Sequence, residues 1–309
     1  MKFILHIGYP RTGTTWLQKR IFTKNKTINY IGCKSYNGKI LKISKEKHLE
    51  FIKNINNLDI NNYFEKEFFS KKKINVFSSE NFTHFQYNSL NLHDNSLNLY
   101  LDKLIKYLKK NFKNVKIEVL CVYREPISFL RSIFFKKNIS ARKLFKTDKY
   151  DIFLEKLINS KIKNNNYYRL SKTLQYDNLY FNLKKNFKDI KLTFIDFDII
   201  KNNSPKYASI LSDIFHIKKD LIKKELNYKE NYLHKSKDEN LIYYNTYLLH
   251  LIKKNFYYLK YITPRFIRKK FFFLFFKNYN LNNPKIVSME NIIKKKFFKH
   301  YINLNSIKN

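Results

Sequence analysis

Glycine is scarce in this chain: it has four glycines in 309 residues, where average usage would give about 22. Cysteine is limited to Cys33 and Cys121, which lie far apart in the sequence. Two distant cysteines exclude a disulfide framework and supply no metal-ligand spacing, so no metal site is expected and a reducing cytoplasm fits. Acidic residues are also few, 24 against 62 Lys and Arg, which leaves a net charge of +38. Such a chain attracts anionic partners such as nucleotides, acidic glycans, anionic lipid or nucleic acid.

Long apolar runs are missing as well. No stretch approaches the roughly 20 apolar residues of a membrane span. The N-terminal apolar run, residues 3–7, is followed by no small-residue cleavage site, so a signal peptide is not expected. These features predict a cytoplasmic protein, with a peripheral position on the cytoplasmic face of the membrane as a variant. The hydrophobic content of 44% excludes a disordered chain.

Apolar runs and helical spacing alternate along the chain. Runs typical of buried strands lie at 3–7, 74–78, 115–122 and 192–197, and a further short strand is an option within 23–44. Helical patterns lie at 16–22, 97–112, 126–135, 147–187 and 205–215. Alternating strands and helices predict an α/β fold, a three-layer sandwich with a mainly parallel sheet and a phosphate-binding loop after the first strand.

Two of the four glycines, Gly8 and Gly13, lie in one loop, between the first strand and a helical pattern that starts at Thr14. A strand, a glycine-bounded loop and a helix form an anion cradle, because loop amides and the helix N-terminus converge on negative charge. The alternative is an ordinary strand-to-helix turn. The phosphate loop of NTPases requires Lys directly after the second glycine, where this chain has Thr14. Its cation lies inside the loop instead, at Arg11.

The segment Gly8-Tyr9-Pro10-Arg11-Thr12-Gly13-Thr14-Thr15-Trp16 resembles the 5′-phosphosulfate-binding loop of sulfotransferases that use 3′-phosphoadenosine 5′-phosphosulfate, PAPS. That family usually has Lys where this chain has Arg11. The resemblance implies PAPS as co-substrate, bound without metal. The amides of residues 12–15 and the hydroxyls of Thr14 and Thr15 would hold the 5′-phosphate. Trp16 would pack on the adenine or, as an alternative, in the core.

A second segment, residues 123–132, looks like the family's 3′-phosphate-binding segment, in which an Arg at a strand end and a Ser eight residues later reach one phosphate. Here these residues are Arg124 and Ser132, and Arg131 is a further candidate contact. A guanidinium binds phosphate through two parallel hydrogen bonds. The alternative is a surface ion pair between Arg124 and Glu125.

The general base is the third element. Transfer to a hydroxyl needs a base within hydrogen-bond reach of the acceptor. Glu80 follows the strand at 74–78, as a catalytic Glu does in the carbohydrate sulfotransferases that this chain resembles. His84 is the alternative base, because the small-molecule members of the family use a His near this place.

The last part of the chain matches no motif. The resemblance covers residues 1–235, which we take as the nucleotide-binding and catalytic domain, and residues 236–309 are expected to form a helical, basic and aromatic extension packed on it. Residues from Leu241 to Leu259 have helical spacing. Such an extension can cap the domain or contact an anionic membrane.

The sequence therefore predicts sulfuryl transfer from PAPS to a hydroxyl, with a sugar of a glycan or glycolipid as the favoured acceptor, by in-line displacement. Glu80 would take the acceptor proton, and Arg11 would stabilise charge on the leaving group. One alternative is a small-molecule kinase with a degenerate phosphate loop, to which Asp196 at a strand end would belong. Another is a non-enzymatic binder of anionic membrane or, less favoured, nucleic acid.

Overall fold

Two units make up the described chain. The computed structural model describes residues 1–9, 11–32, 66–78, 96–135, 145–147, 149–160, 165–227, 241–245 and 276–306. The first unit comprises Met1–Glu125, Arg169–Glu230 and Lys299–Asn309, and the second comprises Pro126–Tyr168 and Asn231–Phe298. The units interleave along the chain, and the expected domain boundary at residue 235 stays a prediction.

A five-stranded parallel sheet forms the centre of the first unit, in the order β2-β3-β1-β4-β5. The strands are β1 Lys2–His6, β2 Ile28–Ile31, β3 Ile74–Ser78, β4 Lys116–Tyr123 and β5 Lys191–Asp196. The central strand β1 pairs Leu5 with Phe77 of β3 on one side and with Val119 of β4 on the other. The four strands expected from apolar runs are confirmed, and strands covered on both faces are largely apolar.

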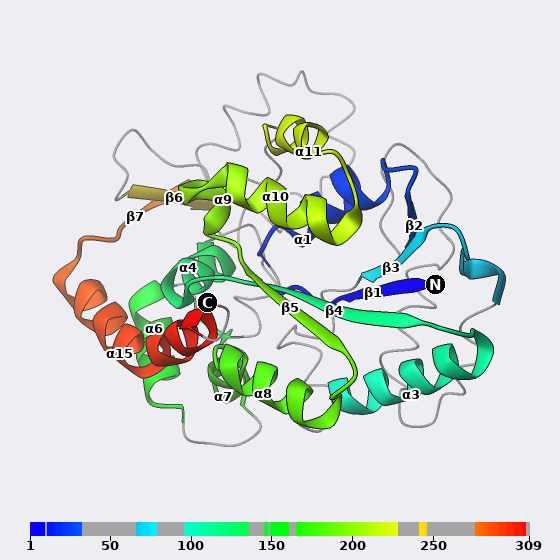
Figure 1. The fold of residues 1–309 in the computed structure, drawn as a ribbon. Coiled ribbons are helices and arrows are strands. Elements are labelled where there is room, and N and C mark those ends of the chain that lie inside the picture. The colour runs from blue at the N-terminus through cyan, green and yellow to red at the C-terminus, as the bar shows by residue number, and fades with distance from the viewer. Residues whose placement is uncertain are drawn as a thin grey trace, which may run out of the picture. The chain divides into compact units, whose positions relative to one another are not determined.

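Helices cover both faces of this sheet (Figure 1). The helices of the first unit are α1 Thr14–Trp16, a π-helix η1 Leu17–Phe22, a 3₁₀ turn η3 Lys66–Phe68, α3 Ser96–Asn111, α8 Tyr176–Asn186, α9 Ile199–Asn202, α10 Ser204–Phe215 and α11 Lys219–Leu226. One apolar cluster joins Ile4 of the sheet to Leu17 of η1 and Leu211 of α10. On the opposite face, the ring of Tyr180 on α8 packs edge-on against Phe194 of β5, with 5.3 Å between ring centroids. The three-layer α/β prediction is confirmed.

The first helix departs from regular α geometry. After α1, the N–H of Thr23 donates to the carbonyl of Gln18, five residues back, at 3.1 Å. This π turn changes the direction in which each side chain points relative to an α-helix. Gln18, a polar residue of this helix, is buried with 2% of its surface exposed.

The second unit has an aromatic core. It contains α4 Pro126–Phe135, α6 Tyr150–Ile158 and most of α15 Pro284–Ser306, whose last residues belong to the first unit. Helix α7, Asn166–Thr173, also crosses from one unit to the other. Phe134 of α4 packs against Tyr150 and Phe153 of α6, with ring centroids 5.1 and 5.2 Å apart. Pro126 at the first position of α4 supports its exact predicted start, since proline needs no donor there.

Two strands correct the expected helical pattern after residue 240. The strands β6 Leu241–Asn245 and β7 Phe276–Asn280 pair antiparallel, with Tyr243 opposite Asn278. The prediction of helix across Leu241 and Tyr244 is therefore wrong. Isoleucine and tyrosine favour strands where a partner is available, and here the partner lies more than 30 residues away along the chain. None of the described helices is long and apolar enough to cross a membrane.

Candidate functional site

The candidate site lies at the carboxyl edge of the sheet, where β1, β4 and β5 end. The N–H of Tyr9, after β1, donates to the carbonyl of Val122 at 3.0 Å, and the N–H of Phe197, after β5, donates to the carbonyl of Tyr123 at 2.8 Å. These bonds tie the segments that follow the three strands to one another. The connection from β1 leads to η1 on one face of the sheet, whereas that from β3 leads to α3 on the other. Ligands of open parallel sheets bind at such a divergence.

The loop after β1 carries two residues in the left-handed region, Arg11 at φ 69° and Gly13 at φ 77°. A left-handed conformation costs a residue with a Cβ about 1–2 kcal/mol, so surrounding contacts must hold Arg11 in it. Thr12 supplies one, because its hydroxyl donates to the carbonyl of Tyr9 at 2.5 Å. The hydroxyl of Thr14 approaches the same carbonyl at 3.4 Å. The hydroxyls of two threonines in the loop are thus directed at one backbone carbonyl, that of Tyr9.

The two glycines are required for different reasons. A Cβ at Gly13 would lie 2.6 Å from Cε2 of Phe197, and φ there is positive. A Cβ at Gly8 would lie 2.8 Å from both Nε2 of His6 and Oγ1 of Thr14. Gly8 therefore allows close packing, and Gly13 allows both close packing and an unusual backbone.

Backbone donors remain available in this loop. Among the described residues, no hydrogen-bond acceptor faces the N–H groups of Thr12, Gly13 and Thr14. N–H groups without acceptors cost stability when they are shielded from water. Their presence in a loop held by side-chain bonds fits a bound anion.

Arg124 follows β4 and has 14% of its side chain exposed. Its Nη1 donates to the carbonyl of Arg11 at 3.4 Å, and its Cζ lies 5.2 Å from the ring centroid of Phe197. Nε lies 3.7 Å from Oδ1 of Asp198, whose Oδ2 accepts the N–H of Glu125 at 3.2 Å. The expected alternative partner, the Glu125 carboxylate, is thus not the ion pair that the structure shows for Arg124; Asp198 is.

Phe197 and Asp198 were not among the predicted site residues. The sequence signal that could have identified them is their position directly after β5. An acidic residue after that strand agrees only loosely with the sulfotransferase resemblance. Phe197 lies against the guanidinium of Arg124 and also close to Gly13. The two residues therefore link the loop after β1 to the arginine after β4.

Trp16 and Tyr9 are packed in the interior of the first unit. Trp16 is 7% exposed, and its indole N–H donates to the carbonyl of Glu225 at 3.1 Å. This is the core packing that the sequence left open as the alternative for Trp16. Tyr9 is 3% exposed, its ring lies edge-on to Tyr176, and burial raises the pKa of its hydroxyl. At position 9, the backbone rather than the side chain faces the loop.

Ser132 and Arg131 belong to α4 in the second unit. Ser132 is 4% exposed, and its joint action with Arg124 stays a prediction. Arg131 forms a bidentate pair with Glu290 of α15, with Nε–Oε1 at 2.7 Å and Nη2–Oε2 at 2.5 Å. The hydroxyl of Tyr150 also donates to Oε1 of Glu290, at 3.2 Å. The guanidinium of Arg131 is thus bound by a carboxylate of its own unit.

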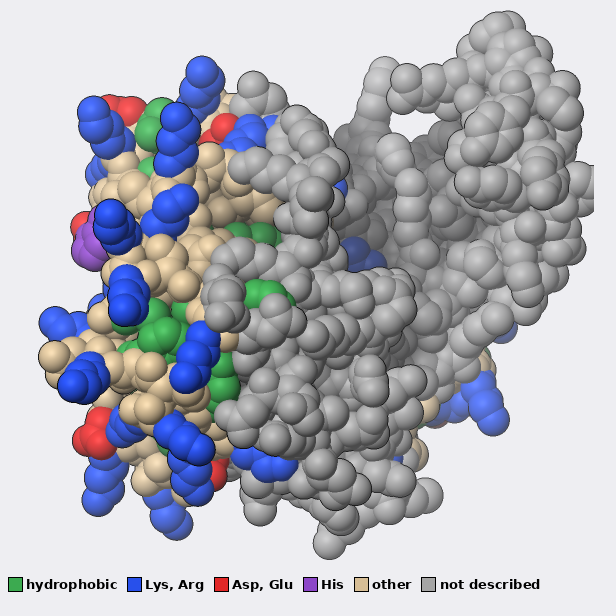
Figure 2. Space-filling model, turned by 90° about the vertical axis from the view of Figure 1, so that its right-hand side faces the viewer, with side chains coloured by type: hydrophobic (Ala, Val, Ile, Leu, Met, Phe, Trp, Pro, Cys, Tyr) green, Lys and Arg blue, Asp and Glu red, His purple; other side chains and the backbone are tan. Residues whose placement is uncertain are grey.

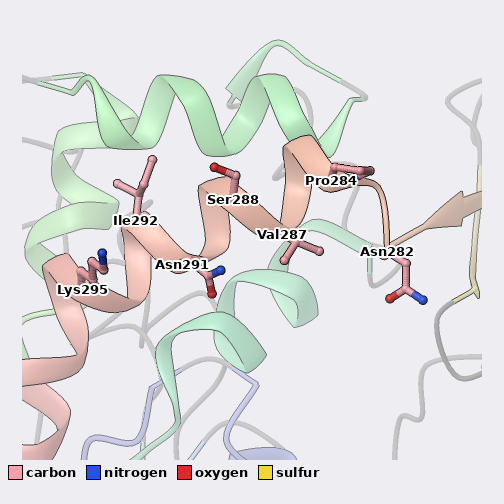
Figure 3. A pocket seen from close by; sticks show the side chains of 7 residues that line it. All are labelled: Asn282, Pro284, Val287, Ser288, Asn291, Ile292 and Lys295. Carbon is pink, nitrogen blue, oxygen red and sulfur yellow. The ribbon is translucent and has the colours of Figure 1, made fainter.

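Pro10, Glu80 and His84 lie outside the described residues, so the base and the proline of the loop stay predictions. Within the described chain, no group of three or more His, Cys, Asp or Glu residues could hold a metal ion. A hollow of about 530 Å³ lies along α15 in the second unit (Figure 3). It is lined by Val287, Ser288, Asn291, Ile292 and Lys295, among others, and by none of the predicted site residues.

A buried polar cluster also escaped the sequence analysis. His6 at the end of β1, Ser78 at the end of β3 and Gln18 in η1 are 0%, 0% and 2% exposed. Nδ1 of His6 lies 2.7 Å from Oγ of Ser78, and the amide nitrogen of Gln18 donates to the same oxygen at 2.9 Å. The sequence signal for this cluster is that His6 and Ser78 are polar residues at the ends of largely apolar strands. Their convergence depends on the strand pairing of His6 with Ser78.

No protein-family model matches this sequence, and no curated protein matches it either. Among solved structures, the chain is similar to mouse sulfotransferase SULT7A1 complexed with PAP, at 13% sequence identity and a TM-score of 0.38. The similarity covers 73% of this chain and 63% of that one, so the chain spans less than two thirds of the solved structure. A similarity at this level assigns neither fold nor activity, and both are argued from this chain's own residues.

Proposed function

We propose that this chain transfers the sulfuryl group of PAPS to a hydroxyl acceptor. The observation that carries the proposal is the loop after β1, in which two left-handed residues leave three backbone N–H groups without a described acceptor, beside the guanidinium of Arg124. This arrangement offers two anion-binding elements at one edge of a parallel sheet. A nucleotide with phosphates at both its 5′ and 3′ positions needs two.

The residues present fit such a ligand. The N–H groups of Thr12, Gly13 and Thr14 are suited to the 5′-phosphate. Arg124 carries five N–H groups but makes one hydrogen bond with a described residue, at 3.4 Å, so its guanidinium has donors for the 3′-phosphate. Ser132 would supply a hydroxyl to the same phosphate. On the face shown in Figure 2, the charged side chains of the described residues are mostly Lys and Arg, which favours the approach of a polyanion.

The residues of the site have distinct roles in this proposal. Bound PAPS supplies an activated sulfuryl group on a phosphate leaving group. Arg11 stabilises the negative charge that develops on that phosphate, and the loop amides hold it in line with the acceptor. Glu80 accepts the proton of the acceptor hydroxyl, with His84 as the alternative base.

Asp196 disfavours the kinase alternative. A kinase would need this carboxylate for a magnesium ion, but Oδ2 accepts the hydroxyl of Tyr301 at 2.5 Å and Oδ1 accepts the N–H of Asp198 at 2.9 Å. The missing lysine after Gly13 removes the second requirement of that chemistry.

We take a sugar hydroxyl as the acceptor class to be tested first, with the protein in the cytoplasm and its basic surface able to contact anionic membrane. Nucleic acid is the less favoured partner. If the protein only bound anionic membrane or nucleic acid through its charge, its affinity would fall steeply with salt and would not depend on the residues of the loop.

Thermal unfolding in the presence of 3′,5′-adenosine bisphosphate tests the proposal, with ATP and magnesium as the comparison. At a hundred times its dissociation constant, a specific ligand stabilises the folded state by about 2.7 kcal/mol, so a clear rise in unfolding temperature is expected with the bisphosphate. ATP with magnesium should produce a smaller rise. Equal or greater stabilisation by ATP, or none by millimolar bisphosphate, would overturn the proposed function.

A further inference from the structure

Asp198 joins the segment after β5 to the segment after β4. Its Oδ2 accepts the backbone N–H of Glu125 at 3.2 Å, and its Oδ1 lies 3.7 Å from Nε of Arg124. All three residues belong to the first unit. One carboxylate therefore binds the backbone directly after Arg124 and forms an ion pair with the side chain of that arginine.

The backbone of Asp198 is itself held by hydrogen bonds. Its N–H donates to Oδ1 of Asp196 at 2.9 Å, and its carbonyl accepts the N–H of Asn202, in α9, at 3.2 Å. The residue is buried, with 9% of its surface exposed. Asp198 therefore presents a charge at a fixed position, to which the more flexible side chain of Arg124 adjusts.

The guanidinium of Arg124 has three contacts with described residues. They are the ion pair of Nε with Asp198, the ring of Phe197 at 5.2 Å from Cζ, and the carbonyl of Arg11, to which Nη1 donates at 3.4 Å. The Nε atom is buried and has no hydrogen-bond partner in the described chain. The charge of Asp198, rather than a hydrogen bond, is therefore what compensates the buried Nε end of the guanidinium.

A carboxylate beside a phosphate-binding arginine has two effects of opposite sign on affinity. It repels the phosphate, which weakens binding. It also holds the guanidinium in one orientation before the ligand arrives, so less side-chain entropy is lost on binding. Neutralising the carboxylate removes both effects at once, so the direction of the change in affinity shows which of them is larger.

We propose that Asp198 is a positioning residue that makes Arg124 selective for a nucleotide with a 3′-phosphate. With Nε paired to Asp198 and Nη1 bonded to the carbonyl of Arg11, the guanidinium is held beside the anion loop. A ligand with two phosphates then meets both anion-binding elements already in place. The proposal rests on the proposed function for the identity of this ligand, and Asp198 acts on it only through Arg124.

Affinities for two nucleotides test the selectivity. Adenosine 5′-monophosphate differs from 3′,5′-adenosine bisphosphate only in lacking the 3′-phosphate. Asp198→Asn removes the charge but keeps an oxygen that can accept the N–H of Glu125. This variant should bind the bisphosphate about tenfold more weakly than the wild type and the monophosphate within about twofold, as measured by isothermal titration at fixed salt.

Asp220→Asn is the matched control. It makes the same change of net charge in the same unit, at an exposed residue of α11 that pairs with Lys223. Because an exposed ion pair contributes little, this variant should leave both affinities unchanged. A tenfold loss in the control would show that the net charge of the unit, not the position of Asp198, determines affinity.

Two other results of the titrations would overturn the proposal. If Asp198→Asn binds the bisphosphate as tightly as the wild type or more tightly, repulsion by the carboxylate equals or exceeds its positioning effect. If the affinities for the two nucleotides fall equally, Asp198 supports the site as a whole and does not determine selectivity for the 3′-phosphate.

The restraint on Arg124 is also measurable without a ligand. Nitrogen-15 relaxation of arginine Nε–H groups reports their motion, and Arg124→Lys identifies the Arg124 signal by its loss. An ordered Nε–H group in the wild type and a clearly more mobile one in Asp198→Asn are expected, and equal order in the two proteins would overturn the positioning role. Failure of the wild type to bind the bisphosphate would instead overturn the proposed function, and the relaxation measurement would still decide whether Asp198 holds Arg124.

Discussion

Arg124 has more hydrogen-bonding capacity than its described neighbours use. Asp198 lies beside its Nε and Phe197 beneath its plane, so two contacts restrain the side chain while Nη1 makes one long hydrogen bond. An arginine with a restrained base and underused terminal donors is suited to bidentate binding of phosphate.

Replacing Arg124 by alanine should therefore weaken binding of 3′,5′-adenosine bisphosphate by about 10- to 100-fold, since hydrogen bonds to charged groups contribute about 1.5–3 kcal/mol. Arg124→Lys should fall between, because an ammonium lacks the planar fork. Isothermal titration at fixed salt measures both. Arg20→Ala is the matched control: it removes a guanidinium of the same unit, while Lys24 still pairs with Glu225 at 2.9 Å. A loss as large in Arg20→Ala would show that net charge, not position, governs binding.

Among single residues, the sequence predicted best those whose position is determined by the local backbone conformation. Gly13 was predicted as one of the two glycines that bound the loop, and the structure shows both a positive φ and a close approach of Phe197 there. The position of Arg124 directly after a strand was predicted from the sequence, but its partner Asp198 was not. Asp198 is 74 residues further along the chain, and only the pairing of β4 with β5 brings it near.

At the level of elements, one buried carboxylate connects three helices of the second unit. Glu290 on α15 is 5% exposed and binds Arg131 of α4 and Tyr150 of α6. Removing one partner of such a pair leaves a buried charge without compensation, whereas removing both does not.

Glu290→Leu alone should lower the free energy of unfolding by about 3 kcal/mol, the lower end of the range for buried pairs, because Arg131 is one third exposed. The double variant Glu290→Leu with Arg131→Met should recover most of that loss. Urea unfolding followed by circular dichroism measures both. A double variant no more stable than the single one would mean that packing rather than charge determines the cost.

Elements were predictable where their signal is local. The strand at residues 74–78 has apolar residues at 74, 76 and 77, and α4 begins at Pro126, as expected. The strands β6 and β7 were missed because a tyrosine-rich segment of five residues satisfies helical spacing as well as strand alternation. Only pairing with a distant segment decides between the two, and a single sequence does not reveal that pairing.

Across the whole molecule, tyrosine is both abundant and buried. The chain has 24 tyrosines, and among those that the structure describes, burial raises the pKa values of Tyr9, Tyr123, Tyr167, Tyr176 and Tyr207. In the unfolded chain each would ionise near pH 10. Above that pH the unfolded state therefore binds fewer protons than the folded state, and stability falls as pH rises.

Each such tyrosine contributes up to about 1.4 kcal/mol per pH unit to this alkaline loss. Tyr207→Phe should make the decline between pH 10 and 11 shallower by about that amount. At pH 7 the variant should be no less stable than the wild type, because the Tyr207 hydroxyl is buried without a hydrogen-bond partner in the described chain. Urea titrations at each pH, with phenolate absorbance recorded in parallel, give the result. Identical pH profiles of the two proteins would contradict it.

The π turn of the first helix also has a consequence for comparison with other chains. A π turn holds one more residue than an α turn over the same span, so it behaves as a single-residue insertion within a helix. Deleting one residue between Lys19 and Phe22 would therefore allow a regular α-helix in which the residues before and after the turn keep nearly their present orientation. The residues lost or displaced would be Arg20 and Ile21, and Ile21 belongs to the apolar core of the first unit. A single-residue gap at this point of an alignment therefore marks a chain whose first helix has a regular α turn where this one has a π turn.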